Sequence, residues 1–118
     1  MKEGDVALTP IPQANGLIKN RPVVLLRQMP VFGDFLVCGI STQLHQEVKN
    51  FDECISLNDT DFLTSGLKAS SIIRLGFLAV LPLRNIVGAI GFISTERHHR
   101  LLNSLCKYLE ANTVRPNS

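Results

Sequence analysis

Residues 22–40 read PVVLLRQMPVFGDFLVCGI, and this stretch indicates the fold. Two runs of β-branched and aliphatic residues, 22–27 and 34–40, flank a segment, 29–33, that contains the proline and glycine typical of a turn. Such an arrangement predicts a β-hairpin. The hairpin indicates a mostly β protein.

The chain on both sides of this hairpin predicts further short strands, over residues 6–8, 54–57, 72–81 and 86–93. Before the hairpin, Pro10 and Pro12 keep the backbone extended, and 13–19 is expected to be a loop. After the hairpin, alternation predicts that Ile55 and Leu57 share one face of a strand.

The segment 72–81 is apolar enough to form one or two buried strands. Within it, Gly76 marks a bend or a bulge, and Pro82 ends it. The strand-like segment 86–93 contains two glycines.

A helix is expected near the C-terminus, because leucines repeat there every four residues at 101, 105 and 109. Ser94 or Thr95 can cap its start. The leucine stripe must pack against the strands or against a partner. Residues 112–118 are expected to form a frayed tail. About six strands and one helix predict a small barrel-like or highly curved β domain with a C-terminal helix.

Length and composition limit the class of protein. The chain has 118 residues, of which 45% are hydrophobic and 19% charged, as expected for one globular domain over residues 1–118. The longest apolar stretch, 77–83, is far shorter than the roughly 18 residues of a membrane span. Since the first residues also lack the pattern of a secretory signal, we expect a cytoplasmic protein without membrane partners.

The three cysteines, Cys38, Cys54 and Cys106, include no Cys-x-x-Cys pair. They fit neither a disulfide framework nor a cysteine-ligated zinc site, and we expect reduced, mostly buried thiols. No phosphate-binding glycine loop or metal-ligand spacing occurs in the sequence, so neither a metal nor another cofactor is expected.

Charge is unevenly distributed along the chain. The net charge of +2 is too small to indicate a nucleic-acid partner by itself. However, residues 68–107 carry six basic side chains and only one acidic one, Glu96, whereas four acidic residues gather between 52 and 61. The pattern suggests that one surface is basic.

Arg21 is the first candidate for a functional residue. It precedes Pro22 where a polar loop meets an apolar strand, so its guanidinium can project into solvent from a fixed backbone position. A guanidinium matches phosphate oxygens with a planar fork, whereas nearby Lys19 would act as a point charge. The alternative is an ordinary solvated arginine.

A second group of candidates, Ser41, Thr42 and Gln43, follows the apolar run that ends at residue 40. Their hydroxyls could donate to a developing anion, or they could bond the backbone of a turn. Arg74 lies inside an apolar strand, where it either faces solvent or lines an anionic-ligand site with Arg21.

The histidines and aromatic residues are weaker candidates for functional residues. His98 and His99 are adjacent on the expected helix and are predicted to be solvated, whereas His45 could transfer a proton. Candidate stacking platforms for nucleic-acid bases are Phe32, Phe35 and Tyr108.

Several motifs taken in order resemble the PemK/MazF family of toxins from bacterial toxin-antitoxin modules. They lie at residues 4–6 (GDV), 19–25 (KNRPVVL), 37–43 (VCGISTQ), 65–68 (SGLK), 71–75 (SIIRL) and 89–94 (AIGFIS). The resemblance extends from residue 4 to about residue 110.

The resemblance implies an SH3-like β-barrel that forms a homodimer and cleaves single-stranded RNA at short sequences without a metal ion. The products would be a 2′,3′-cyclic phosphate and a 5′-hydroxyl, and a cognate antitoxin peptide would silence the enzyme. Arg21 would contact the scissile phosphate as acid or charge stabiliser, Ser41 or Thr42 would bond the developing phosphorane, and Arg74 would be the later basic residue. Expected substrate-binding residues are Gln13, Lys19 and Gln43.

The chain also departs from the family pattern. Gly76 stands where relatives commonly have Asp, and a short segment with Gln13, Asn15 and Gly16 replaces a longer loop before Arg21. Gly76 therefore favours one alternative to the nuclease, a catalytically degenerate dimer that binds an antitoxin. A second alternative is a CcdB-like inhibitor of DNA gyrase, since the related CcdB-like toxins have the same fold.

Overall fold

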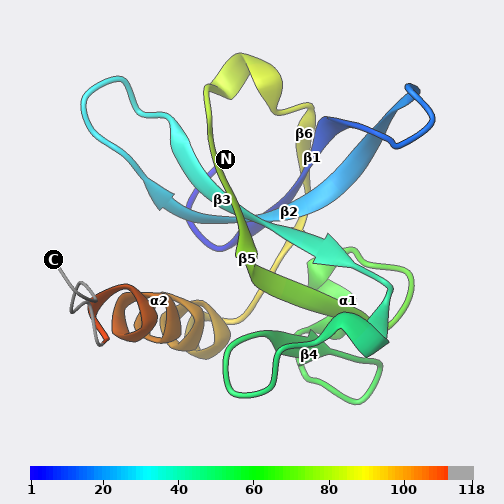
Figure 1. The fold of residues 1–118 in the computed structure, drawn as a ribbon, viewed down its shortest axis with the longest axis vertical. Coiled ribbons are helices and arrows are strands. Elements are labelled where there is room, and N and C mark those ends of the chain that lie inside the picture. The colour runs from blue at the N-terminus through cyan, green and yellow to red at the C-terminus, as the bar shows by residue number, and fades with distance from the viewer. Residues whose placement is uncertain (112–118) are drawn as a thin grey trace, which may run out of the picture.

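The computed structural model describes residues 1–111 and contains one sheet of six antiparallel strands, curled into a half-barrel (Figure 1). The strand order is β4-β5-β3-β2-β1-β6. The strands are β1 (Asp5–Pro12), β2 (Ile18–Gln28), β3 (Phe35–Ser41), β4 (Glu53–Ile55), β5 (Ser71–Leu81) and β6 (Gly88–Phe92). The helices are α1 (Phe62–Ser65) and α2 (Thr95–Glu110), and the 3₁₀ turns are η1 (Leu44–Gln46) and η2 (Leu83–Asn85). The predicted fold, a small β-barrel with a C-terminal helix, is confirmed.

The predicted hairpin is formed by β2 and β3, which pair from Val23 opposite Gly39 to Gln28 opposite Phe35. Its turn lies where the proline and glycine were found. β2 is longer than expected, because it already begins at Ile18 within the predicted loop 13–19, whereas β3 lies within one residue of the predicted 34–40 at each end.

The first strand is also longer than predicted and runs through Pro10 and Pro12. Proline lacks an N–H donor and is tolerated in a strand that has a neighbour on one side only. Beyond Leu8, β1 pairs with β2 but no longer with β6, so the two prolines interrupt no ladder on that open side. The prediction for 54–57 was wrong at its end, because β4 stops at Ile55 and the Leu57 side chain is 73% exposed.

Both faces of the sheet carry buried apolar clusters. The larger one includes Val6, Val24, Ile73 and Leu101 and lies under α1 and α2. The smaller one, on the opposite face, is formed around Val23, Leu25, Phe35, Val37 and Ile86. Successive residues along one strand therefore belong to different clusters, because side chains alternate between the two faces of a sheet.

The bulge expected at Gly76 is present in β5. Arg74 pairs with Gly39, whereas Leu78 pairs with the adjacent Cys38, so residues 75–77 have no partner on β3. The extra residues bend the strand and reverse its parity. β5 thereby crosses from one side of the half-barrel to the other, as Figure 1 shows.

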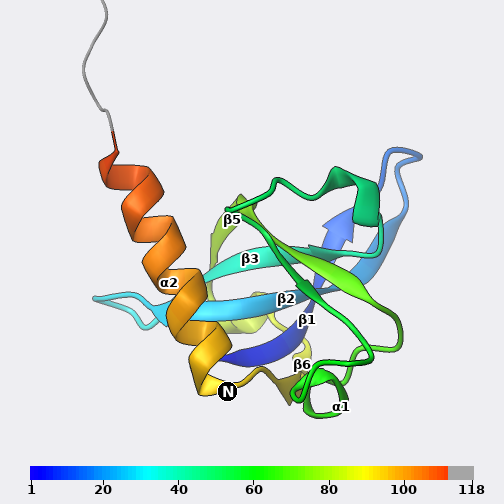
Figure 2. The same ribbon diagram turned by 90° about the horizontal axis from the view of Figure 1, so that it is seen from below.

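The C-terminal helix α2 stands beside the half-barrel rather than on top of it (Figure 2). The Ser94 hydroxyl caps it by accepting a hydrogen bond from the Arg97 N–H at 3.1 Å. Leu101 and Leu105 are buried, but Leu109 is 62% exposed, so the leucine stripe is covered only in its first half. His98 was predicted to be solvated, yet it lies half-buried with its Nε2 2.7 Å from the Leu26 carbonyl oxygen.

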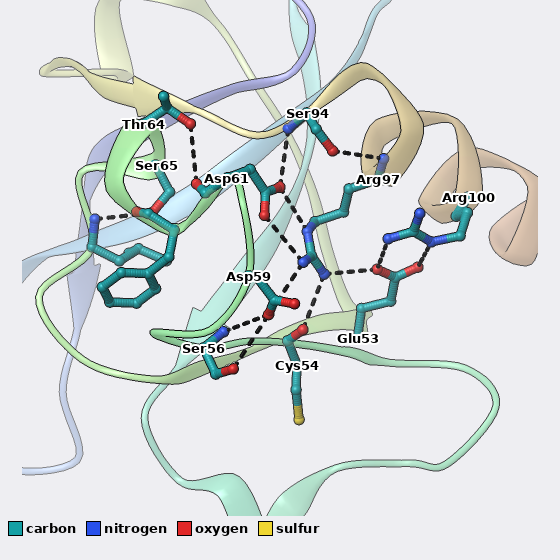
Figure 3. A network of polar contacts seen from close by, with 12 residues as sticks. Glu53, Cys54, Ser56, Asp59, Asp61, Thr64, Ser65, Ser94, Arg97 and Arg100 are labelled. Carbon is teal, nitrogen blue, oxygen red and sulfur yellow. Dashed lines mark hydrogen bonds and ion pairs between the residues drawn. The ribbon is translucent and has the colours of Figure 1, made fainter.

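A buried ionic network ties the start of α2 to β4 and to the loop before α1 (Figure 3). Arg97 donates to both carboxylate oxygens of Asp61, at 2.8 and 3.2 Å, and to Glu53 at 2.8 Å. Its guanidinium also lies 3.4 Å from Asp59. Burial by itself raises the pKa of Asp61, but hydrogen bonds and charge from Arg97 outweigh it and lower that pKa.

The ionic network reduces the positive charge that was expected on one surface. Glu53 also binds Arg100 through two hydrogen bonds of 3.1 Å. Two of the six basic residues in 68–107 are therefore neutralised by the acidic stretch that precedes them, because the fold brings the two segments together.

The prediction of mostly buried cysteines was wrong. Cys38 is buried, and burial raises the pKa of its thiol to about 12, whereas Cys54 and Cys106 are exposed. No helix among residues 1–111 is long and apolar enough to cross a membrane. The expected frayed tail, 112–118, lies outside the described residues.

Candidate functional site

A groove of about 470 Å³ opens where the end of β1, the first half of β2 and the end of β3 meet the start of β5. In Figure 1 the β1–β2 hairpin and the end of β3 both lie on the right of the molecule. The side chains that line this groove come from five segments of the chain: Ile11, Pro12, Gln13, Ala14, Arg21, Pro22, Gly39, Ile40, Ser41, Thr42, Gln43, Leu67, Lys68, Ala69, Ser71, Arg74 and Phe77.

Arg21 is exposed and lies on β2 opposite Thr9 of β1, at the mouth of the groove. Its Nη2 donates a 2.7 Å hydrogen bond to Oε1 of Gln13. The Gln13 amide is itself held, because its Nε2 donates to the Ile11 carbonyl oxygen at 2.9 Å. The neutral glutamine thus orients the guanidinium without cancelling its charge, and other N–H groups of the arginine stay available for an anion.

Ser41 ends β3 and faces the same groove. Its Oγ accepts a 3.0 Å hydrogen bond from the Gln43 backbone N–H, which is the turn interaction considered as the alternative from the sequence. The hydroxyl proton is not used by this bond, so the group can still donate to a ligand. Thr42 and Gln43 follow it, both exposed.

Arg74 is half-buried on β5, opposite Gly39 of β3. It lines the groove together with Lys68, from the segment that precedes β5. Every charged side chain of the lining is therefore cationic, namely Arg21, Lys68 and Arg74. None of the three makes an ion pair with any described residue. This concentration of unpaired positive charge attracts an anionic ligand.

Other candidates lie elsewhere. Lys19 is exposed two residues before Arg21 on β2, and it does not line the groove. His45, on η1, does not line it either. Of the aromatic candidates, Phe35 is buried in the smaller cluster, so its assignment as a stacking platform was wrong. Phe32 and Tyr108 are exposed but lie outside the groove.

Gly76 stands where relatives of the resembled family commonly have Asp, and its surroundings show where a carboxylate at this position would lie. A Cβ placed there would have the Phe51 ring as its nearest neighbour, at 3.9 Å, and Phe51 is not a groove residue. A carboxylate at residue 76 would therefore begin outside the groove lining.

Two groove residues, Lys68 and Phe77, were not predicted as functional candidates from the sequence. Lys68 belongs to one of the motifs, but only the fold places it across from Arg21. Phe77 looked like part of an apolar strand, and the bulge that turns it into the groove depends on pairing with β3. Within residues 1–111, no three His, Cys, Asp or Glu side chains gather as a metal-binding set.

Comparison with known proteins supports the fold. No protein-family model matches the sequence, and no curated protein matches it. Among solved structures, the chain is similar to the Mycobacterium tuberculosis toxin MazF-mt6, with a TM-score of 0.66 and 15% sequence identity. The match covers 89% of this chain and 95% of that chain. At this identity the likeness establishes the MazF-type fold alone.

Proposed function

We propose that this protein is the toxin of a toxin-antitoxin pair, acting as an endoribonuclease that cleaves single-stranded RNA without a metal ion. The observation that carries the proposal is the groove, in which Arg21, Lys68 and Arg74 are the only charged side chains and all are cationic. Phosphate contacts dominate the affinity of nucleic-acid binders. The MazF-type fold and the motif resemblance support the inference that the anionic ligand of this groove is RNA.

The reaction needs no cofactor in this scheme. The ribose 2′-oxygen forms a bond to the adjacent phosphorus, the bond from phosphorus to the 5′-oxygen breaks, and a proton passes from the 2′-hydroxyl to the leaving oxygen, directly or through water. The products are a 2′,3′-cyclic phosphate and a 5′-hydroxyl. Negative charge accumulates on the phosphorane oxygens, and donors placed around them lower the barrier.

We assign the charge-stabilising role to Arg21 and Arg74, and hydrogen bonding of the phosphorane to Ser41 or Thr42. Gln13 and Gln43 present amides to the groove, which suits contacts to base edges. Lys19 would contact a neighbouring phosphate of the RNA, because it lies two residues before Arg21 on β2.

A second candidate function follows from one specific observation. Among residues 1–111, no Asp, Glu or His side chain lines the groove, so the described lining contains none of the usual general bases. A protein of this fold that binds RNA or an antitoxin peptide without cutting RNA would need only the cations. Cleavage assays distinguish the two candidates.

We also propose a homodimer. Exposed apolar side chains, Val80, Leu83 and Val87, gather around η2 between β5 and β6. Exposed apolar side chains grouped in one region are typical of protein interfaces. Leu83→Glu should shift the mass measured by light scattering toward the monomer, whereas Leu57→Glu, at an exposed leucine of another loop, should leave it unchanged.

The decisive experiment incubates purified protein with a long, weakly structured RNA in the presence of a chelator and maps the ends produced. Arg21→Ala is compared with Arg27→Ala, because Arg27 lies on the same strand but pairs with Glu3 away from the groove. We expect discrete cuts from the wild type and from Arg27→Ala. Loss of one charge-stabilising donor costs about 10²- to 10³-fold in rate, so Arg21→Ala should be nearly inactive.

Wild-type rates in Arg21→Ala would remove this residue from the mechanism. Intact RNA at every wild-type concentration would reject the nuclease and favour the non-cleaving binder.

A further inference from the structure

We propose that Phe77 is the platform on which one base of the bound RNA stacks, and that this stacking holds the nucleotide beside the arginines of the groove. This inference rests on the proposed RNA substrate. In a regular strand, Phe77 would lie on the opposite face of the sheet, away from the groove.

The bulge in β5 determines where Phe77 points. In an unbroken strand, residues 73, 75 and 77 would share one face. Ile73 and Leu75 are buried in the larger apolar cluster, so Phe77 would join them. Because residues 75–77 have no partner on β3, the parity changes, and Phe77 lines the groove together with Arg74.

Gly39 provides the surface on which the Phe77 ring lies. A Cβ at residue 39 would come within 2.9 Å of Cδ1 and 3.2 Å of Cγ of that ring. Such distances are shorter than van der Waals contact, so only glycine leaves room for the ring in this place. The ring is therefore held against the β3 backbone before any ligand arrives, which reduces the entropy lost on binding.

The rest of the Phe77 side chain is open to solvent, with 44% of its surface exposed. It is the only aromatic side chain among the groove-lining residues. Only the buried part of the ring stabilises the fold, because apolar surface contributes to stability when it is removed from water. The available surface suits a flat apolar partner.

The charges around the ring identify that partner. Arg21, Lys68 and Arg74 line the same groove, and no carboxylate of the described part of the chain does. Proteins that bind single-stranded nucleic acids combine a positively charged groove for the backbone with aromatic side chains on which bases stack. An RNA nucleotide supplies both groups, a phosphate for the cations and an unpaired base for Phe77.

The test uses a short single-stranded RNA whose 2′-hydroxyls are methylated, so that it binds without being cleaved. One position carries a fluorescent adenine analogue whose emission falls when it stacks. The protein variants are Phe77→Leu, which keeps apolar volume without the flat ring, and Phe77→Tyr, which keeps the ring. Phe32→Leu is the control, since Phe32 is exposed but outside the groove.

We expect wild type, Phe77→Tyr and Phe32→Leu to quench the fluorescence, with dissociation constants within about twofold of one another. Phe77→Leu should abolish the quenching and raise the dissociation constant about tenfold. Gly39→Ala, which pushes the ring from its place, should have the same effect. Circular dichroism and thermal unfolding establish that each variant is folded.

Equal binding and quenching by Phe77→Leu and wild type would overturn the stacking role while leaving the nuclease proposal intact. That result would also be expected if a protein partner covers Phe77. Failure of the wild type to bind the methylated RNA at all would overturn both proposals.

Discussion

Replacement of Arg97 by methionine should destabilise the protein far more than the same change at Arg100, one helical turn away. The Arg97 side chain is 6% exposed and holds Asp61, which is 5% exposed, with two hydrogen bonds. The Arg100 side chain is 54% exposed and contacts Glu53. Methionine preserves much of the side-chain length in both variants, so the comparison isolates the charge and its hydrogen bonds.

The expected magnitude follows from the carboxylate that is left behind. Without Arg97, Asp61 retains the 3.0 Å hydrogen bond from the Ser94 N–H but loses its buried counter-charge. Breaking a buried ion pair by removing one partner costs about 3–5 kcal/mol. For a domain of this size, about 4 °C of melting temperature is lost per kcal/mol, so Arg97→Met should melt about 12–20 °C lower. An exposed pair contributes at most about 1 kcal/mol, which limits the effect of Arg100→Met.

Urea unfolding followed by circular dichroism measures both variants, with the slope of the transition checked for a change in the unfolded state. The double variant Asp61→Asn with Arg97→Met should lose less than the sum of the two single changes, since no charge is stranded in it. Equal, small losses of unfolding free energy for Arg97→Met and Arg100→Met would refute the reasoning that the buried network anchors α2.

Three further predictions follow from the same structure. The pKa of Asp61 is lowered in the folded state from its ordinary 3.8, so its stabilisation is complete above that pH and is lost as the pH falls through the folded value; Asp61→Asn should flatten this acid limb of the stability curve. Gly91→Ala should cost about 3 kcal/mol or more in urea unfolding, because its Cβ would overlap the backbone of α1, whereas Gly88→Ala meets open space and should be nearly neutral. An alkylating reagent at pH 8 should label the two exposed cysteines of the native protein, and mass spectrometry should find Cys38 modified only after unfolding, since burial raises its pKa to about 12.

The sequence was sufficient to predict the elements whose signals are local. Alternating β-branched residues and a turn segment identified the hairpin of β2 and β3, and the serine cap with a leucine repeat identified α2. Of the site residues predicted from the sequence, six line one groove, namely Gln13, Arg21, Ser41, Thr42, Gln43 and Arg74, whereas Lys19 does not. Residues that end strands or precede prolines carry such signals because the local backbone fixes them.

Pairing between distant segments decided the rest. Leu57 has the alternation of a strand residue, yet it is exposed because β5 offers a partner to β4 only through Ile55. Arg97 and Asp61 are 36 positions apart and look like ordinary surface charges, and their burial depends on where α2 is placed. Long-range ion pairs leave no periodic trace in a sequence.

The sequence by itself therefore determined that this chain forms a mostly β, highly curved domain with a C-terminal helix, and that Arg21 directly precedes an apolar strand segment. Only the tertiary structure decided that three cations share one groove and that Phe77 joins them. The physical reason is the register of β5 on β3, because three unpaired residues at Gly76 reverse the side-chain parity that the sequence alone would predict.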